Sequence, residues 1–338
     1  MRVCLLGRHF SLHGAGLGRV SMEIRNGLVK RGHSVHTIST NGDSLYSYFF
    51  YTLCEVPIRL RKEKVDVWHA VTPMEGMWLP KRKCIVTFHD LHLITNSDRV
   101  GAGMGGNNLK NLIAKEYFRF AVGIAKGCSR VVAVSEKTKE DLVEYLGVPE
   151  EKIKVIKSGI RNDLIPTNRR EKVFRVGYLG QLDKRKRVDL LIEAFKRSNL
   201  DELVIGGVGL DASMLKKQAE GDNRIKFLGL IPDNELADFY NSLDVFVFPT
   251  AIEGYGLPIV EAMACRKPVI VLSDTIIPQE VKSRCIIVED LEYVLGNKGY
   301  LEGLCKNVDY DGNYEWAKSH SWDRCVESYI ELYKEICE

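Results

Sequence analysis

Short apolar runs alternate with helical stretches along most of the chain, and this alternation is the feature that most limits its possible folds. Short runs without polar alternation are typical of strands buried on both faces of a parallel sheet. A first series of runs ends near Ile156, and a second begins at Phe174 after the polar stretch 161–172. The two series predict an α/β protein with two doubly wound parallel sheets facing across a cleft.

The length of the chain agrees with this division. At 338 residues it exceeds the size at which a single hydrophobic core usually keeps growing. We place a first domain at 1–160, a linker at 161–172, a second domain at 173–318 and a closing segment at 319–338. Strands are predicted at 2–6, 35–39, 65–70, 84–88, 130–134 and 153–156, then at 174–179, 203–206, 225–228, 245–248, 269–272 and 285–288.

Two carboxylates flank a glycine-containing loop after the strand predicted at 245–248. Glu253 begins the loop, and Glu261 lies in the apolar helix start that follows. A charged group in so apolar a setting needs a partner or a ligand. The helix start also offers free N–H groups and a positive dipole end to a phosphate. The residues fit an active centre for a phosphorylated sugar, or a plain strand–loop–helix unit in which Glu261 pairs with a surface lysine.

The spacing of these two carboxylates resembles a known family signature. Glu253 and Glu261, with seven residues between them around Gly-Tyr-Gly-Leu-Pro, resemble the E-x7-E motif of the retaining GT-B glycosyltransferases, which are family 4-like ("glycosyl transferases group 1"). The resemblance implies two Rossmann-like domains and a C-terminal helix that crosses back to the first domain. It also implies transfer of a hexosyl group from a nucleotide diphosphate sugar, with no metal and no other cofactor.

The resemblance further implies a role for individual residues. Glu253 orients the sugar, His89 contacts it beside the reacting carbon, and Lys186 holds the diphosphate. The implied substrate-binding residues are Gly16, Gln181, Arg185, Arg187, Leu230, Ile231, Gly254, Tyr255, Gly256, Leu257 and Glu261. Because Glu253 is expected to face the sugar rather than the core, its removal should harm turnover more than folding.

Gln181 departs from the family pattern, which usually has arginine at this position. Glutamine keeps a hydrogen-bond donor but loses a charge, which weakens stabilisation of the leaving group. Arg185 or Arg187 compensates for this loss, or activity is low. A catalytically silent nucleotide-sugar-binding relative is therefore an alternative. A dehydrogenase is disfavoured, because Arg19 stands where the last glycine of G-x-G-x-x-G is required.

The segment 46–64 carries several aromatic residues ahead of a basic end. In one interpretation it is a core helix with solvated charges, whose inner face consists of Leu45, Phe49, Leu53, Val56 and Leu60. In the other, its aromatic and basic residues contact a membrane surface or a lipid-linked glycan acceptor. No global charge indicates a nucleic-acid partner, since 48 basic residues stand against 45 acidic ones.

The cellular compartment is predicted from the cysteines and from the apolar runs. The nine cysteines are scattered singly and show no zinc-site spacing, as expected of reduced thiols. No run has the length of a signal peptide core or a membrane span. These features predict a cytoplasmic protein, attached to the inner face of the cell membrane if the second interpretation of 46–64 holds.

Overall fold

The structure is a computed structural model, and it describes residues 1–10, 15–40, 45–95, 108–167 and 173–338. The described residues form two compact units. Unit 1 contains the residues up to 95, those from 108 to 159 and those from 321 to 338, and unit 2 contains 160–167 and 173–320.

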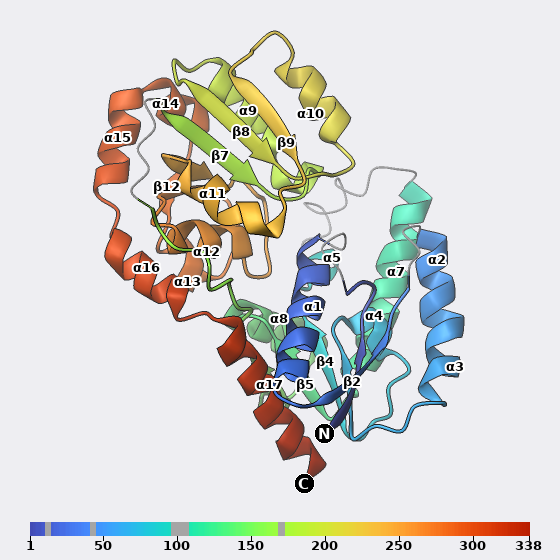
Figure 1. The fold of residues 1–338 in the computed structure, drawn as a ribbon. Helices are drawn as coiled ribbons and strands as arrows, with labels where there is room; N and C mark the ends of the chain where they lie inside the picture. Colours follow the sequence, from blue (N-terminus) through green and yellow to red (C-terminus); the bar gives the residue numbers. More distant parts are fainter. Residues whose placement is uncertain (11–14, 41–44, 96–107, 168–172) are drawn as a thin grey trace. The chain divides into compact units, whose positions relative to one another are not determined.

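Unit 1 is built on a parallel sheet of six strands in the order β2-β1-β3-β4-β5-β6 (Figure 1). The strands are β1 (Arg2–Leu6), β2 (Ser34–Ile38), β3 (Val67–Ala70), β4 (Cys84–Phe88), β5 (Arg130–Ala133) and β6 (Ile153–Val155). Every residue of β4 is buried, as expected of a central strand covered on both faces. Leu6 pairs with Ala70 and Phe88 with Ala133, so these strands end at the same edge of the sheet.

The helices of unit 1 are α1 (Ala15–Lys30), α2 (Leu45–Phe50), α3 (Val56–Leu60), α4 (Pro73–Gly76), α5 (His92–Thr95), α7 (Asn108–Ala125), α8 (Glu136–Leu146) and α17 (Trp322–Cys337). Helix α8 begins after Ser135, whose hydroxyl accepts a hydrogen bond from the Thr138 N–H at 3.1 Å. Gly16, which the resemblance implies as a substrate-binding residue, lies in the first turn of α1.

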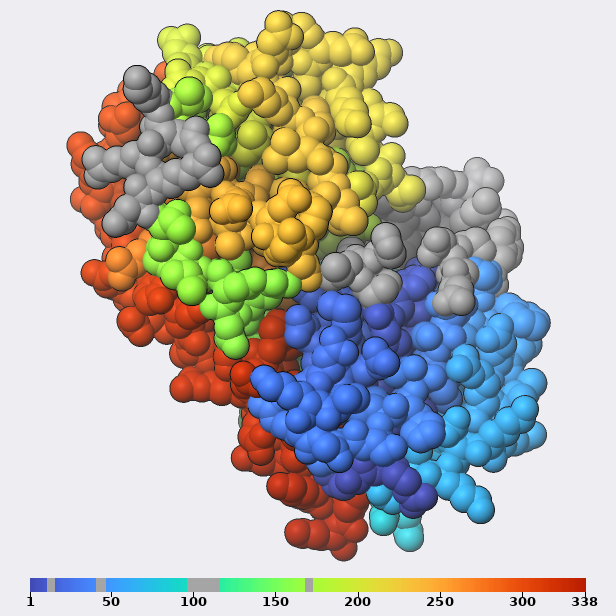
Figure 2. All heavy atoms as spheres, viewed as in Figure 1, coloured from blue at the N-terminus to red at the C-terminus, as the bar shows by residue number. Residues whose placement is uncertain are grey.

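The segment between α2 and α3 differs from the regular helix that the sequence predicts. Residues Tyr51–Glu55 form a π-helix, η2, whose wider turn moves the following side chains around the helix axis. Leu53, expected in the core, is exposed, whereas Tyr48 and Tyr51 are buried. Only part of the predicted inner face is therefore correct. In Figure 2, the blue atoms of residues 45–60 form part of the outer surface of unit 1.

The last helix, α17, completes unit 1, as the sequence predicts. It packs so closely on α1 that a Cβ at Gly27 would lie 2.5 Å from Val326. Arg31, which directly follows α1, donates to Asp323 at 2.8 Å. The buried His69 ring on β3 contacts the Tyr333 hydroxyl of α17 at 2.7 Å and Thr87 Oγ1 at 2.9 Å. Burial lowers the pKa of His69 to about 3, so the ring is neutral.

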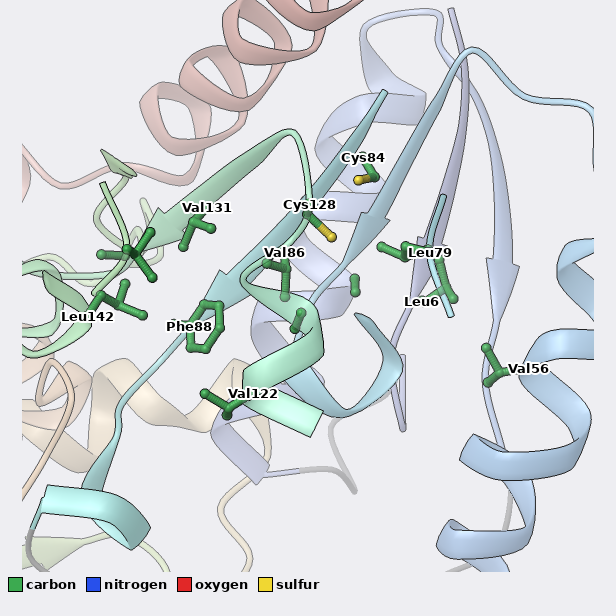
Figure 3. Close-up of a cluster of buried hydrophobic side chains, with 14 of the residues drawn as sticks. Leu6, Val56, Leu79, Cys84, Val86, Phe88, Val122, Cys128, Val131 and Leu142 are labelled. Atoms are coloured by element: carbon green, nitrogen blue, oxygen red, sulfur yellow. The ribbon is translucent and has the colours of Figure 1, made fainter. Parts of the chain in front are cut away.

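The core of unit 1 brings two cysteines together that the sequence places far apart (Figure 3). Cys84 is the first residue of β4. Cys128 lies just before β5, which is the neighbouring strand. The Cys128 thiol donates a hydrogen bond to Cys84, and the Ser129 N–H donates to the Cys84 sulfur at 3.3 Å. The hydrogen bond from the Cys128 thiol is the main reason why the pKa of Cys84 is lowered to about 7. The cysteines are single along the sequence, but the fold brings these two free thiols together.

Unit 2 contains a second parallel sheet of six strands in the order β12-β11-β10-β7-β8-β9. The strands are β7 (Arg175–Leu179), β8 (Glu202–Gly206), β9 (Ile225–Gly229), β10 (Val245–Val247), β11 (Val269–Leu272) and β12 (Ile286–Val288). The two predicted sheets are thus both present, in the predicted order along the chain.

The helices of unit 2 are α9 (Val188–Lys196), α10 (Ala212–Ala219), α11 (Leu236–Asn241), α12 (Leu257–Ala264), α13 (Gln279–Lys282), α14 (Leu291–Gly296), α15 (Lys298–Lys306) and α16 (Tyr310–Lys318). Two 3-10 turns, η5 (Lys184–Lys186) and η6 (Asp233–Glu235), lie between them and the strands. The described part of the predicted linker is bound to this unit. Asn241 donates to the Ile165 carbonyl at 2.9 Å and accepts from the Thr167 N–H at 2.8 Å.

None of the helices in the described part of the chain combines the length and the apolar composition that a membrane crossing requires.

Candidate active site

The loop that follows β10 holds Glu253 in a fixed position. The backbone N–H of Glu253 donates to the Ile276 carbonyl at 2.9 Å, and the N–H of Ala251 donates to the Arg185 carbonyl at 2.8 Å. The loop is therefore tied both to the segment after β11 and to the turn η5. These ties place a carboxylate at the carboxyl edge of the sheet, where parallel sheets usually bind ligands.

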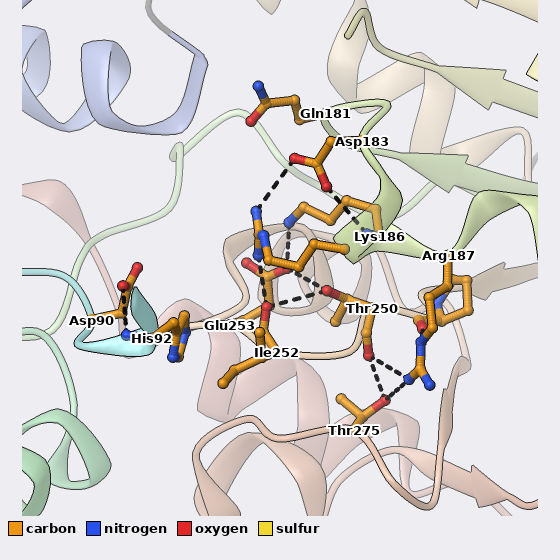
Figure 4. Close-up of polar contacts among 12 residues, drawn as sticks. Asp90, His92, Gln181, Asp183, Lys186, Arg187, Thr250, Ile252, Glu253 and Thr275 are labelled. Atoms are coloured by element: carbon orange, nitrogen blue, oxygen red, sulfur yellow. Dashed lines mark hydrogen bonds and ion pairs between the residues drawn. The ribbon is translucent and has the colours of Figure 1, made fainter. Parts of the chain in front are cut away.

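One carboxylate oxygen of Glu253 receives three donors (Figure 4). Lys186 Nζ donates to Oε1, Arg185 contacts the same oxygen at 3.2 Å, and the Thr250 hydroxyl donates to it at 2.7 Å. Burial alone would raise the pKa of Glu253, but the Lys186 and Arg185 charges outweigh it and lower the pKa to about 2. Glu253 is consequently a carboxylate at every physiological pH.

The second oxygen of Glu253 has a different environment. Among the described residues, none donates a hydrogen bond to Oε2. The side chain is only 14% exposed, so it cannot turn freely in solvent. The structure thus presents one oriented carboxylate oxygen that is able to accept a hydrogen bond from a ligand.

Lys186 is the buried cation of this cluster. It ends η5, where the Asp183 side chain accepts from its backbone N–H at 3.2 Å. Its ammonium group lies 5.1 Å from the centre of the Phe248 ring. Burial lowers the pKa of Lys186, while Glu253 acts in the opposite direction. The ammonium is held by Glu253 rather than by solvent.

The basic run 184–187 does not form one charged surface, because η5 turns its members in different directions. Lys184 is exposed, while Arg185 donates to the Ile252 carbonyl at 2.7 Å. Arg187 donates to the Pro249 carbonyl at 2.7 Å and pairs with Asp274 at 2.7 Å. Arg187 therefore holds the loop after β10 in place, and we do not propose it as a ligand of the diphosphate.

Gln181 lies in the loop after β7, next to a closely packed neighbour. Its side chain is exposed, and its carbonyl accepts from the Tyr178 hydroxyl at 3.0 Å. Gly207 has a φ of +121°, and a Cβ there would lie 1.8 Å from the Gly180 carbonyl oxygen. The absence of a side chain at Gly207 lets the loop after β8 pack directly on the backbone that leads to Gln181.

The helix α12 begins at the glycine loop, as predicted for a phosphate site. Gly256 caps it with a φ of +91°, and Leu257 is its first residue. Pro258 is the second residue. The Tyr240 hydroxyl of α11 donates to Glu261 Oε2 at 2.8 Å. Glu261 is buried, and this tyrosine is one of its partners.

The other predicted residues of unit 2 lie around this edge of the sheet. Gly254 is half-buried, and Tyr255 is buried with its ring 6.1 Å from that of His320. Leu230 follows β9 and is exposed. Ile231 is buried against Gly206, so its side chain belongs to the core and only its backbone is available to a ligand.

The two remaining predicted site residues, His89 and Gly16, belong to unit 1. His89 follows β4, and its Nε2 lies 2.9 Å from the Val71 carbonyl, which fixes Nε2 as the protonated nitrogen. Burial lowers the pKa of His89, although the Val71 carbonyl and Asp90 oppose this. The neutral ring therefore keeps Nδ1 as an acceptor. Gly16 is exposed, and a Cβ there would meet no atom within 4 Å.

No group of three or more His, Cys, Asp or Glu that could hold a metal ion is found within the described ranges.

Two family models match the chain, and they correspond to its two units. The model "Glycosyltransferase Family 4" matches residues 43–164, and "Glycosyl transferases group 1" matches residues 160–287. The chain belongs to the family 4-like GT-B glycosyltransferases. It is accordingly a nucleotide-sugar-dependent glycosyltransferase.

Curated relatives of this glycosyltransferase include several bacterial and archaeal enzymes. It is 24% identical to O-antigen chain mannosyltransferase B of Escherichia coli, with 81% of this chain and 76% of the relative covered. It is 28% identical to an uncharacterized glycosyltransferase of Methanocaldococcus jannaschii, with 92% of each covered. The capsular polysaccharide biosynthesis glycosyltransferase CapM of Staphylococcus aureus is 25% identical, with 73% and 74% covered.

Solved structures confirm the GT-B fold. Sucrose-phosphate synthase from Thermosynechococcus elongatus superposes with a TM-score of 0.77 at 17% identity, covering 99% of both chains. WaaG, a glycosyltransferase involved in lipopolysaccharide biosynthesis, gives a TM-score of 0.72 at 15% identity, covering 98% of this chain and 99% of that one.

Three residues of the glycosyltransferase's candidate site were not predicted from the sequence. Thr250 and Asp183 each lie three residues before a predicted residue, Glu253 and Lys186 respectively, and both carry the short polar side chains that cap turns. A short polar residue three positions before a predicted site residue is therefore a sequence signal that could identify both. Tyr240, the partner of Glu261, carries no comparable signal, because it lies in an apolar helix far from the motif.

Proposed function

We propose that this glycosyltransferase moves a hexosyl group, with retention of configuration, from a nucleotide diphosphate sugar to a glycan acceptor. The observation that carries the proposal is the Glu253 carboxylate, anchored through Oε1 by Lys186, Arg185 and Thr250. Such an anchored carboxylate is suited to orient sugar hydroxyls through Oε2, and it is the first glutamate of the E-x7-E motif.

Each of the other groups supplies one part of the transfer. Lys186 carries the positive charge that stabilises the departing diphosphate, and the helix start at Gly254 to Leu257 provides backbone donors for it. Gln181 contributes a neutral donor. Glu261, oriented by Tyr240, accepts hydrogen bonds from the ribose hydroxyls.

Retention is proposed to follow from attack on the same face as the leaving group. The acceptor oxygen forms a bond to the anomeric carbon while the bond to the diphosphate oxygen breaks. The departing phosphate oxygen takes the acceptor proton. His89 contacts the transferred sugar, and its neutral ring accepts a hydrogen bond at Nδ1.

The acceptor is proposed to be a lipid-linked glycan in polysaccharide synthesis. The support comes from relatives named for O-antigen and capsular polysaccharide biosynthesis. The α2–α3 segment offers a surface for peripheral membrane contact, because Phe50 is 60% and Ile58 is 56% exposed, and the basic Arg61, Lys62 and Lys64 that follow are exposed too. Arg59 is not part of this surface, since it donates to the Ser39 carbonyl at 2.9 Å.

A catalytically silent nucleotide-sugar-binding relative is the second candidate. Gln181 favours it, because the leaving diphosphate then meets one cation fewer than in the family pattern. Arg185 is the nearest replacement, but its contacts to Ile252 and Glu253 already direct it toward the loop.

The test is a panel of nucleotide sugars with the purified chain. Binding is measured by thermal shift, and donor turnover is measured as release of nucleotide diphosphate with and without extracted lipid-linked glycans. We expect one donor to bind and to turn over faster with the acceptor, and the product to keep the anomeric configuration by NMR. Binding without any turnover would support the silent relative, and an inverted product would overturn the retaining mechanism.

A further inference from the structure

His92 is a buried imidazole in unit 1 that has no assigned role. It begins α5, three residues after His89, and is 8% exposed. Its backbone N–H donates to Asp90 Oδ1 at 3.2 Å, and Figure 4 shows the two residues side by side. Neither ring nitrogen has a hydrogen-bond partner in the part of the chain that the structure describes. The backbone is thus held in place while the ring is left unsatisfied.

The other buried imidazole in the described part of unit 1 is satisfied by the protein. The two nitrogens of His69 contact Tyr333 and Thr87, at 2.7 and 2.9 Å. The half-buried His89 has one nitrogen on the Val71 carbonyl, at 2.9 Å. A buried polar group without a partner destabilises the folded protein, and native structures contain few of them. His92 follows β4, so this unsatisfied side chain lies at the carboxyl edge of the sheet, where ligands bind in folds of this kind.

The hydrogen-bonding pattern of the ring indicates the class of ligand. A neutral imidazole has one donor and one acceptor. Phosphate oxygens accept hydrogen bonds but donate none when ionised, so they satisfy only one of the two nitrogens. A hydroxyl group both donates and accepts, and neighbouring sugar hydroxyls satisfy both. Because each hydroxyl can donate or accept, a sugar satisfies both nitrogens whichever of them carry protons.

We propose that His92 is a substrate-binding residue whose two ring nitrogens hydrogen-bond to the hydroxyl groups of a sugar. The proposal rests on the proposed function, and it adds a residue that the sequence motifs do not include. The sugar has two sources in that reaction, namely the transferred hexosyl group of the donor and the acceptor glycan. The two sources predict different kinetic effects, which the experiment separates.

The experiment uses the full chain and two variants, His92→Leu and His92→Gln. The leucine side chain removes both polar atoms at similar volume, so the melting temperature without ligand should be unchanged or higher. A structural role predicts the opposite, a lower melting temperature. The glutamine side chain keeps a donor and an acceptor, and it should restore most of the lost binding.

Three affinities are measured for each protein: for the nucleotide diphosphate alone, for the nucleotide sugar found with the panel, and for the acceptor as its KM. The diphosphate affinity should not change. If His92 contacts the donor sugar, His92→Leu should weaken nucleotide-sugar binding about tenfold, as expected for lost hydrogen bonds. If it contacts the acceptor, the acceptor KM should rise about tenfold at unchanged donor affinity.

The experiment distinguishes failure of the role of His92 from failure of the proposed function. A wild-type chain that binds no nucleotide sugar would overturn that function and the role of His92 with it. A wild-type chain that transfers sugar, combined with His92→Leu having unchanged affinities for donor and acceptor, would overturn the role of His92 alone. Weaker binding in His92→Leu that glutamine does not relieve would also count against hydrogen bonding by the ring.

Discussion

At the scale of single residues, the candidate site contains one carboxylate that is tied into the fold. Glu253 neutralises the buried Lys186 through Oε1, and we propose that Oε2 binds the sugar. The sequence motif singles out Glu253, but it does not predict that the side chain is enclosed. The expectation that its removal leaves folding unaffected is therefore revised. The partners could not be chosen from the sequence, because four consecutive basic residues are candidates and only the turn η5 brings two of them, Arg185 and Lys186, to Glu253.

The variant Glu253→Gln should unfold more easily at pH 7, because it leaves Lys186 buried without a counter-charge. The pKa of Glu253 is lowered from 4.5 to about 2 in the folded chain, which corresponds to about 3 kcal/mol at neutral pH. Because the folded-state pKa is the lower one, this stabilisation is present above pH 4.5 and is lost as the pH falls toward 2. Urea unfolding at pH 7, 4.5 and 3 measures it.

The control for that variant is Glu292→Gln, which removes an exposed ion pair with Arg197 in the same unit. Such surface pairs are worth at most about 1 kcal/mol. Equal pH dependence of the wild type and Glu253→Gln between pH 4.5 and 3 would contradict the assigned charge state of Glu253.

The variant Gln181→Arg should bind the donor more tightly. The exposed side chain at this position is free of packing constraints, and arginine adds a charge where the diphosphate is proposed to lie. A charge-assisted hydrogen bond contributes about 1.5–3 kcal/mol, so affinity for nucleotide diphosphate should rise at least about tenfold. Asn307→Arg adds the same charge at the exposed end of α15 and serves as the control. An equal effect of both variants would indicate a general charge effect rather than a contact.

At the scale of elements, closely packed loops determine the shape of the site. The variant Gly207→Ala places a Cβ 1.8 Å from the Gly180 carbonyl and requires a backbone shift. We expect a loss of more than about 2 kcal/mol in unfolding free energy, together with weaker nucleotide binding. Thermal unfolding with and without nucleotide diphosphate measures both.

Gly303→Ala is the matched control for Gly207→Ala, because position 303 lies in α15 with no atom within 4 Å of the added Cβ. It should be neutral or stabilise the chain by up to about 1 kcal/mol. If Gly207→Ala is as stable as Gly303→Ala, the two loops are not packed as described.

The helical elements also show a limit of prediction from the sequence, namely which side chains face the core. Hydrophobic periodicity identifies the 45–60 segment as helical, and Val56 is buried as expected. The periodicity assumes a constant number of residues per turn, which the π-helix Tyr51–Glu55 breaks. For that reason the predicted inner face includes Leu53, which is exposed, and lacks Tyr51, which is buried. Strand positions were predicted well, since a buried parallel strand needs only a short apolar run.

At the scale of the whole molecule, the hydroxyl of Tyr333 links the last helix to the sheet of unit 1. Tyr333→Phe removes the partner of the buried His69 nitrogen, which should cost about 1–3 kcal/mol. Tyr293→Phe, at an exposed position of unit 2, is the control. Thermal unfolding monitored by hydrogen exchange should show the loss in unit 1 peptides. A loss spread equally over both units would contradict this assignment.

Peripheral attachment to a membrane is tested on the same scale. Phe50, Leu53 and Ile58 are exposed near three basic residues, each worth about 1 kcal/mol beside anionic lipid. The wild type should sediment with anionic vesicles at low salt and be released at high salt. A variant with Arg61, Lys62 and Lys64 changed to serine should stay in solution. Changing Lys216, Lys217 and Lys226 of unit 2 instead should have no effect, and absence of wild-type sedimentation at low salt would exclude the attachment.

The position of α17 has a consequence for synthesis on the ribosome. Domains generally fold as they emerge, beginning at the amino terminus. Here unit 2 is continuous from residue 160, whereas unit 1 lacks α17 until residues 322–337 have been translated. The half of the enzyme that is translated first is therefore completed last. Until then, the surface that will receive Tyr329 and Tyr333 is uncovered, so a chain truncated after His320 and released from the ribosome should contain a protease-resistant unit 2 and a protease-sensitive unit 1.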